Sequence, residues 1–164
     1  MKTKKAKTEK RPAPKAQVIL PAYVRSRRKK KLGFDLHGVI DANGTFFQTF
    51  FRDLIRAGWE IHILTGATWK KEKRALKTLG IPFTHFFSII DYHISIGTKI
   101  TWDKKGNPHM DDYLWSQTKA LYCQDHGITM HFDDSDIYGF FFKTPYVRYY
   151  SKSTKRVRKM HLRV

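Results

Sequence analysis

Short apolar runs alternate with amphipathic segments along the middle of the chain. Strands are predicted where apolar residues are continuous, at residues 32–36, 59–64, 86–90 and 128–132, with a last edge strand at 146–150. Apolar residues at helical spacing predict helices over residues 43–57, 69–79 and 111–126. Residues 94–102 and the turn that follows them, 103–106, are typical of a hairpin. Strands that alternate with helices predict an α/β domain, a three-layer Rossmann-like fold with a mostly parallel sheet.

The charge is distributed unevenly and divides the chain into three parts. Residues 1–31 contain thirteen Lys or Arg and one acid, and residues 143–164 contain eight Lys or Arg and no acid. The segment between them has eleven Lys or Arg and thirteen acids, although the whole chain has a net charge of +18. We therefore expect a basic arm at 1–31 that is disordered until bound, an α/β domain at 32–150 and a basic tail at 151–164.

Cationic arms of this kind bind polyanions by releasing counterions from phosphates. The interpretation favoured here is binding to nucleic acid or to a ribonucleoprotein, and the alternative is a solubilising tail. Cys123 is the only cysteine, which excludes an intrachain disulfide and fits the cytoplasm or another reducing compartment. Localisation in the nucleus is also possible, because the segment from Arg25 to Lys31 resembles a nuclear-localisation patch. With no apolar run of about 18 residues and no apolar leader, neither a membrane span nor a secretory signal is expected.

Carboxylates follow two of the predicted strands. Asp35 follows the run at 32–34, and Asp133-Asp134 follow the strand at 128–132. Ligand sites of open α/β sheets form beyond the carboxyl ends of the strands. Carboxylate oxygens there suit Mg²⁺, and a carboxylate beside Mg²⁺ can act as a phosphoryl nucleophile. Taken alone, each acid could instead cap a turn or a helix.

Four segments in this order resemble motifs of the haloacid dehalogenase-like (HAD) phosphatase superfamily. They are Phe34-Asp35-Leu36-His37-Gly38, Ile61 to Thr65-Gly66, Lys119, and His131-Phe132-Asp133-Asp134. The resemblance covers about residues 32–136 and departs from the family pattern at His37, where a second Asp is usual. Taken singly, Thr65-Gly66 could be a strand-exit turn and Lys119 a solvated lysine.

The resemblance implies a role for each matched residue. Asp35 would be the nucleophile that forms an aspartyl phosphate. Thr65 and the backbone N–H of Gly66 would hold the phosphoryl oxygens, and Lys119 would offset the repulsion between two anions. The implied cofactor is Mg²⁺, with ligands from Asp35, the backbone carbonyl of His37, and Asp133 or Asp134.

His37 replaces the acid that, in the family, protonates the leaving group and then activates water. An imidazole with a pKa of about 6.5 can do both. Two alternatives remain: a slow enzyme, or a non-catalytic member kept for binding. The other histidines have no zinc-like spacing; His62 and His131 are expected on strand faces, and the rest (His85, His93, His109, His126 and His161) at the surface or in packing.

Two further groups of residues have both a functional and a structural interpretation. The basic run Lys70 to Arg74 could reach a second phosphate or simply form a solvated helix face. Most aromatic residues, Phe46, Phe47, Phe50, Phe51 and Phe140 to Phe142, are expected in the core. Tyr92, Trp102 or Tyr113 near the hairpin could stack on bases.

The spacing of the motifs limits the substrate. Thirty residues separate Asp35 from Thr65 and fifty-four separate Thr65 from Lys119, which leaves no room for a large cap domain. By the family's pattern an uncapped site suits large phosphorylated substrates. The sequence therefore predicts an enzyme, a hydrolase that removes a terminal phosphate from a polynucleotide, or acts as a nucleotidase. The alternative is a non-catalytic nucleic-acid or ribonucleoprotein component; a protein phosphatase is a third possibility that the charge does not favour.

Overall fold

The centre of the protein is a sheet of five parallel strands. The computed structural model describes residues 30–150, so most of the expected basic arm and the whole of the tail at 151–164 lie outside the described residues. The sheet has the order β3-β2-β1-β6-β7, with every neighbouring pair parallel. The strands are β1 (Lys31–Asp35), β2 (Glu60–Thr65), β3 (His85–Ser88), β6 (Met130–Asp133) and β7 (Tyr146–Arg148). This α/β arrangement was predicted and is compatible with a Rossmann-like fold.

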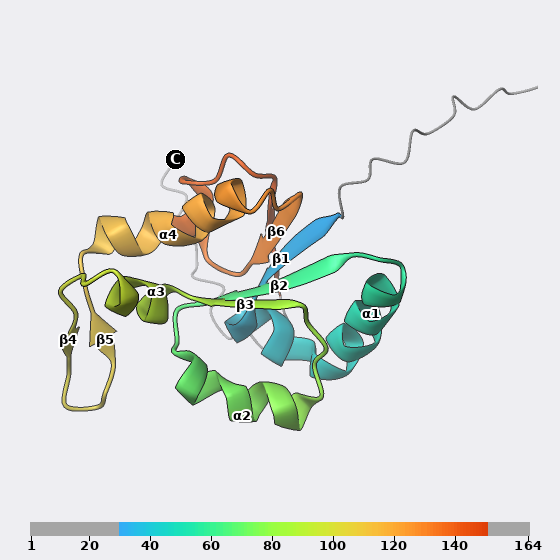
Figure 1. Cartoon of the computed structure of the whole chain (residues 1–164), viewed down its shortest axis with the longest axis horizontal. Coiled ribbons are helices and arrows are strands. Elements are labelled where there is room, and N and C mark those ends of the chain that lie inside the picture. Colours follow the sequence, from blue (N-terminus) through green and yellow to red (C-terminus); the bar gives the residue numbers. More distant parts are fainter. Residues whose placement is uncertain (1–29, 151–164) are drawn as a thin grey trace, which may run out of the picture.

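Helices cover both faces of this sheet (Figure 1). On one face lie α1 (Gly44–Arg56) and α2 (Trp69–Leu79), and on the other lies α4 (Asp112–Asp125). Shorter elements complete the chain: a π-helical turn η1 (Leu36–Ile40), a 3₁₀ turn η2 (Asp41–Asn43), α3 (Ile89–Ser95) and α5 (Asp136–Gly139). The predicted helices at 69–79, 43–57 and 111–126 are thus confirmed, the last two to within one residue at each end.

Alternation along β2 explains the two cores. Ile61 and Ile63 face the larger core, where Phe34 packs against Phe51 of α1 with ring centroids 4.5 Å apart. Leu64 faces the opposite side and packs with Cys123 of α4. Because successive strand residues point to opposite faces, one strand supplies both layers.

The third predicted strand, 86–90, is wrong at its carboxyl end. The strand stops at Ser88, and Ile89 and Ile90 are buried in the first turn of α3. The Ser88 hydroxyl accepts a hydrogen bond from the backbone N–H of Asp91 at 3.0 Å and so caps this helix. An apolar run of this length does not by itself distinguish a strand from a buried helical turn.

The predicted hairpin starts too early. Ile94 belongs to α3, and only β4 (Thr101–Trp102) and β5 (Pro108–His109) pair as a separate antiparallel ribbon. The turn at 103–106 is confirmed: the Asp103 carboxylate accepts backbone hydrogen bonds from Lys105 and Asn107, each at 2.8 Å. This ribbon is a small flap rather than a cap domain.

Two boundaries at the ends of the domain also differ from expectation. Lys31, assigned to the arm, is the first residue of β1, and its ammonium group lies 3.5 Å from the carboxylate of Glu60 on β2. The edge strand predicted at 146–150 ends at Arg148. None of the helices in residues 30–150 is long and apolar enough to cross a membrane.

The order of the strands places a switch point between β1 and β6. The chain moves outward from β1 to β2 and β3, and then returns to the other side of β1 with β6. The crevice at the carboxyl ends of such neighbouring strands is the usual ligand site of open α/β sheets. Asp35 and Asp133 are the last residues of these two strands.

Candidate active site

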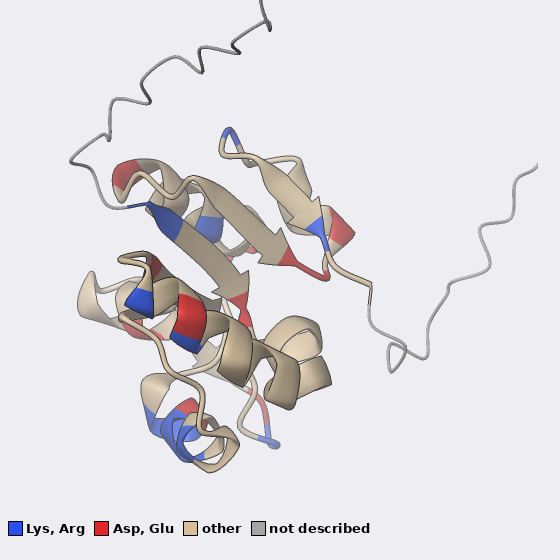
Figure 2. Cartoon of the chain, turned by 90° about the vertical axis from the view of Figure 1, so that its right-hand side faces the viewer, with Lys and Arg blue, Asp and Glu red and all other residues tan. Residues whose placement is uncertain are grey.

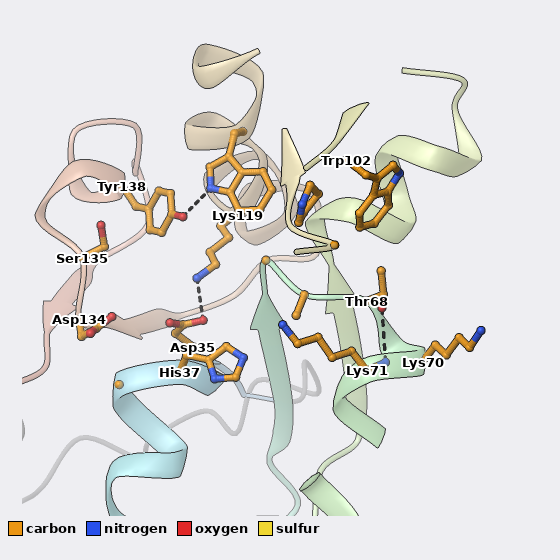
Figure 3. A pocket seen from close by; sticks show the side chains of 16 residues that line it. Asp35, His37, Thr68, Lys70, Lys71, Trp102, Lys119, Asp134, Ser135 and Tyr138 are labelled. Atoms are coloured by element: carbon orange, nitrogen blue, oxygen red, sulfur yellow. Dashed lines mark hydrogen bonds and ion pairs between the residues drawn. The ribbon is translucent and has the colours of Figure 1, made fainter. Parts of the chain in front are cut away.

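A buried lysine joins the two strand-end carboxylates. The Lys119 ammonium group, from α4, donates to Asp35 Oδ1 at 2.8 Å (Figure 3). It also donates to Asp133 Oδ2 at 2.7 Å. All three residues are buried. β1 and β6 pair in register at Phe34 and Phe132, so the parallel ladder brings the next residue of each strand to the same level. The sequence predicted Lys119 beside Asp35, where it is found, and Asp133 or Asp134 as a metal ligand; the contact of Lys119 with Asp133 was not predicted.

The two carboxylates have opposite protonation behaviour. Burial, together with the charge of Asp133, raises the pKa of Asp35 to about 6 against the opposing charge of Lys119. Burial also acts to raise the pKa of Asp133, but hydrogen bonds and charge from His131 and Lys119 hold it well below its usual range. Asp133 is therefore a fixed anion, whereas the charge of Asp35 is sensitive to its surroundings.

A third carboxylate stands at the mouth of the site. One carboxylate oxygen each of Asp35, Asp133 and Asp134 lie within 4.8 Å of one another. Burial and the charge of Asp133 raise the pKa of Asp134. Three carboxylates against one ammonium group leave this cluster negative, and hard oxygen donors of this kind suit Mg²⁺.

Gly38 allows this approach of Asp134. It has a φ of 77°, and a Cβ at this position would lie 2.1 Å from Asp134 Oδ2. The Gly38 N–H donates to Asp41 Oδ1 at 2.7 Å, which fixes the turn that follows β1. Any larger residue would both strain the backbone and displace the carboxylate.

The imidazole of His37 lies between two carboxylates. Its Nδ1 is 3.0 Å from Asp41 Oδ2, and its Nε2 is 3.3 Å from Glu72 Oε1. Burial acts to lower the pKa of His37, but the hydrogen bond to Asp41 and the charges of Glu72, Asp41 and Asp35 outweigh it, so the pKa is raised. The imidazolium form is thereby favoured, which fits a proton donor better than the neutral base that was also expected.

The turn between β2 and α2 forms the opposite wall of the pocket. Gly66, Ala67 and Thr68 line it together with Lys70 and Lys71. Figure 3 shows the Lys71 side chain extending toward the carboxylates and that of Lys70 extending away from them. The same helix carries most of the basic residues that Figure 2 shows at one end of the domain.

Thr65 is not on the lining of this pocket. The residue is fully buried, and its hydroxyl oxygen accepts a hydrogen bond from the Ala67 N–H at 3.2 Å. Its predicted part in holding phosphate is better fitted by Gly66, which lines the pocket, and by the half-buried turn after it. A Cβ on Gly66 would lie 2.7 Å from the Trp115 ring, so only glycine fits against that wall.

Aromatic side chains form the rest of the pocket, whose volume is about 790 Å³. Trp115 donates its indole N–H to the Tyr138 hydroxyl at 2.6 Å, and the Lys119 ammonium group lies 4.7 Å from the centre of the Tyr138 ring. Trp102 and Pro108 of the ribbon close the far side. Half of the Trp102 surface, 51%, is exposed.

The structure brings most of the predicted site residues to one pocket. Its lining includes Asp35, His37, Gly66, Lys119 and Asp134, while Asp133 lies directly behind Lys119. The sequence interpretation missed Glu72, Asp41, Trp115 and Tyr138. Glu72 is the single acid in a basic run, and its helical position turns it away from solvent, so only 3% of it is exposed.

Comparison with known proteins adds no relative: no family model, no curated protein and no solved structure matches this chain.

Proposed function

We propose that the protein is a Mg²⁺-dependent phosphomonoesterase of the HAD-like, capless kind that works through an aspartyl phosphate. The observation that supports this most directly is the trio of Asp35, Lys119 and Asp133 at the switch point of the sheet, with Asp134 at its open side. Buried charges of this density cost stability, and perturbed groups in a pocket are typical of catalytic sites.

Hydrogen-bond partners favour Asp134 over Asp133 as the metal ligand. Asp133 Oδ2 accepts from Lys119 and His131, and its Oδ1 accepts from the Ser135 N–H. No side-chain hydrogen bond to Asp134 is found within residues 30–150. Asp35, Asp134 and the backbone carbonyl of His37 would therefore hold Mg²⁺, while Asp133 holds Lys119. When bound, Mg²⁺ neutralises the oxygens of the phosphoryl group.

Asp35 would act through the carboxylate oxygen that Lys119 leaves free. Lys119 binds Oδ1, so Oδ2 attacks phosphorus while the bond from phosphorus to the ester oxygen breaks. Water then attacks the phosphorus of the aspartyl phosphate, which releases inorganic phosphate and restores the carboxylate. The Lys119 charge lowers the repulsion between the anions in both steps.

His37 would supply the proton in the first step. The ester oxygen that leaves as an alkoxide takes a proton from the imidazolium, and the neutral imidazole recovers one from the attacking water in the second step. The contact from Nε2 to Glu72, at 3.3 Å, is the longer of its two contacts and is the one expected to open. The cost is that a smaller fraction of His37 is in the neutral form at a given pH than for a free imidazole.

The pocket supports a nucleotide or the phosphorylated end of a polynucleotide as substrate. Its volume of about 790 Å³ exceeds what a phosphate alone fills. Lys71 offers charge beside the reacting group, and the exposed face of Trp102 offers a surface on which a base can stack. The basic arm and tail would hold the remaining polyanion near the site.

The decisive experiment measures phosphate release with Mg²⁺. The substrates are an aryl phosphate, nucleoside monophosphates, and oligonucleotides with a 3′ or 5′ phosphate. Asp35→Asn should abolish release, whereas Asp53→Asn, an exposed acid on α1, should not. Absence of Asp35-dependent release from every substrate would overturn the enzyme proposal.

The charge distribution favours a second candidate, a non-catalytic nucleic-acid or ribonucleoprotein component. In that case oligonucleotides bind without phosphate release. Removing residues 1–29, which carry eleven Lys or Arg and one Glu, should in either case lower oligonucleotide affinity by about tenfold or more and flatten its salt dependence. Unchanged binding by the shortened chain would contradict a role for the arm.

A further inference from the structure

A second cluster of ligand-type side chains lies at the opposite, amino end of the sheet. Glu60 and His62 are two residues apart on β2, so they share one face. His85 is the register partner of His62 on β3 and stacks on it, with ring centroids 4.2 Å apart and ring planes 9° apart. The donor atoms of the three residues lie within 4.8 Å of one another.

His62 has an unsatisfied nitrogen that faces this cluster. The residue is 1% exposed, its Nδ1 lies 2.9 Å from the Tyr122 hydroxyl of α4, and its buried Nε2 has no hydrogen-bond partner. Glu60 Oε2 lies 3.6 Å from this nitrogen, beyond ordinary hydrogen-bonding distance. A buried polar atom without a partner is costly, and in a native protein it calls for an explanation such as an ion.

The tautomer of His85 follows from the hydrogen bonds of Thr84. The Thr84 hydroxyl gives its single proton to the Ile61 carbonyl at 2.9 Å and accepts the Ile61 N–H at 2.8 Å. Its remaining lone pair is 2.9 Å from His85 Nδ1, which must therefore carry the proton. The lone pair of neutral His85 is consequently on Nε2, the form that binds metals.

We propose that Glu60, His62 and His85 form a binding site for a transition-metal ion, with Zn²⁺ as the best-fitting one. Two imidazole nitrogens and one carboxylate are a typical zinc donor set, with water as the fourth ligand. Metal-bound histidines usually have a hydrogen-bond partner on their other nitrogen, and in both imidazoles here that nitrogen has one, a hydroxyl group.

Closure of the site requires a small movement of one exposed side chain. Ligand atoms of tetrahedral zinc lie about 3.3 Å apart for bonds of about 2.0–2.1 Å, less than the 4.8 Å limit found here. His85 is exposed on the edge strand β3, so its ring can turn toward His62. Lys31 contacts Glu60 Oε2 at 3.5 Å, and a carboxylate can serve an ammonium group and a metal through its two oxygens.

The metal would tie three elements together at a distance from the catalytic pocket. Glu60 and His62 belong to β2, His85 to β3, and Tyr122, the partner of His62, to α4. The three ligands are outside the lining of the pocket at the carboxyl ends. The site is thus separate from that pocket, and it does not depend on the phosphatase proposal.

The experiment titrates the untagged, chelator-treated full chain with Zn²⁺ in competition with a chromogenic chelator, and follows thermal unfolding in parallel. His85→Gln changes an exposed ligand and Glu60→Gln removes a charge. His109→Gln is the matched control, since this exposed imidazole also lies near a carboxylate, 3.7 Å from Asp103. Asp35→Asn tests whether Zn²⁺ binds at the carboxylate cluster of Asp35 instead of at the proposed site.

The proposal expects one Zn²⁺ per chain in the wild type, His109→Gln and Asp35→Asn, with a rise in the unfolding temperature. His85→Gln and Glu60→Gln should each lose affinity by about tenfold or more and lose the rise. Absence of Zn²⁺ binding in the wild type, or unchanged affinity in both ligand variants, would overturn it. Loss in Asp35→Asn alone would also overturn it, because the ion would then belong to the catalytic pocket.

Discussion

The two ends of the sheet use histidine and carboxylate in opposite ways. At the carboxyl end, His37 lies between Asp41 and Glu72, which favour its charged form. At the amino end, burial and the neighbouring His85 lower the pKa of His62 to about 4, so that its imidazole is neutral. The same two residue types therefore suit a proton donor at one end and a metal ligand at the other.

The difference is the source of the compensating charge. The carboxyl end has a buried ammonium group, Lys119, that allows carboxylates to be packed against each other. Within the described residues the amino end has no such buried cation; Lys31 beside Glu60 is partly exposed. Hard oxygen ligands and a fixed cation suit Mg²⁺ and phosphate, whereas imidazole nitrogens suit zinc.

The largest effect is expected from removing the buried cation. Lys119→Met leaves Asp35 and Asp133 buried without their partner, which should lower the free energy of unfolding by about 3–5 kcal/mol. In metal-free protein His85→Gln at the other end should cost no more than about 0.5 kcal/mol, because the residue is exposed. Urea unfolding measures both changes in free energy, with Lys73→Met, at an exposed lysine, as control. Equal losses of stability in Lys119→Met and His85→Gln would contradict the proposed difference between the two ends of the sheet.

The next effect concerns catalysis by His37. His37→Asn should lower kcat about 100-fold through loss of the proton donor. The donor form is present below the raised pKa of His37 and is lost as pH rises through it. Glu72→Gln removes a charge that raises this pKa, so the alkaline limb of the pH–rate profile should move to lower pH, and the His37 NMR titration should move with it.

A further variant distinguishes a site that is adapted to histidine at position 37 from one in which histidine slows turnover. His37→Asp restores the residue usual in the family that this motif resembles. Faster turnover would indicate that histidine limits the enzyme, and slower turnover would indicate that the site is adapted to an imidazolium. An NMR titration of His37 that does not respond to Glu72→Gln would contradict the electrostatic account of this histidine.

A smaller effect, an increase in stability, is expected from replacing Asp35, the proposed nucleophile. The pKa of Asp35 is raised from 3.8 to about 6, so the folded state binds more protons than the unfolded state between these values. Its ionisation thus opposes folding above about pH 6 and has no effect below about pH 4. Without Mg²⁺, Asp35→Asn should stabilise the protein at pH 7 by up to about 3 kcal/mol. Urea unfolding at pH 7 and pH 4 tests this; a destabilised variant at pH 7 would refute it.

The smallest effect is on substrate preference. Trp102→Ala should raise the KM of a nucleotide substrate by an amount equivalent to about 1–2 kcal/mol, and Trp102→Phe should retain most of the affinity. A small alkyl phosphate without a base should be hydrolysed equally by all three proteins. An equal change for both substrates would show that the ribbon acts on the pocket in general and not on a base.

The local sequence predicted the site residues that lie directly at the ends of parallel strands. Asp35 and Asp134 follow apolar runs, and parallel pairing then brings strand ends together without further information. Thr65 also follows an apolar run, but its side chain is buried, and its hydroxyl accepts a hydrogen bond within the turn instead of lining the pocket. Because side chains of a strand alternate between its two faces, a shift of one residue decides whether a side chain lines the pocket.

Other parts required contacts between distant segments that no local pattern contains. Glu72 looks like one acid in a solvated basic run, and only the packing of α2 beside the turn after β1 brings it to His37. His62 and His85 have no zinc-like spacing, because their proximity arises from the register of two strands. The boundary at Ser88 was missed because capping, rather than hydrophobicity, ends β3.

The parallel direction of β1 and β7 has a consequence for the two basic ends of the chain. β1 begins at the amino edge with Lys31, whereas β7, parallel to β6, ends at Arg148, the register partner of Asp133. The last described residues therefore lie beside the carboxylates, and the first lie at the opposite end of the strands. A tether attached beside a reaction centre raises the effective concentration of what it holds, and one attached far away contributes mainly avidity. Removing the tail should raise KM for oligonucleotide ends, and removing the arm should weaken retention of long strands.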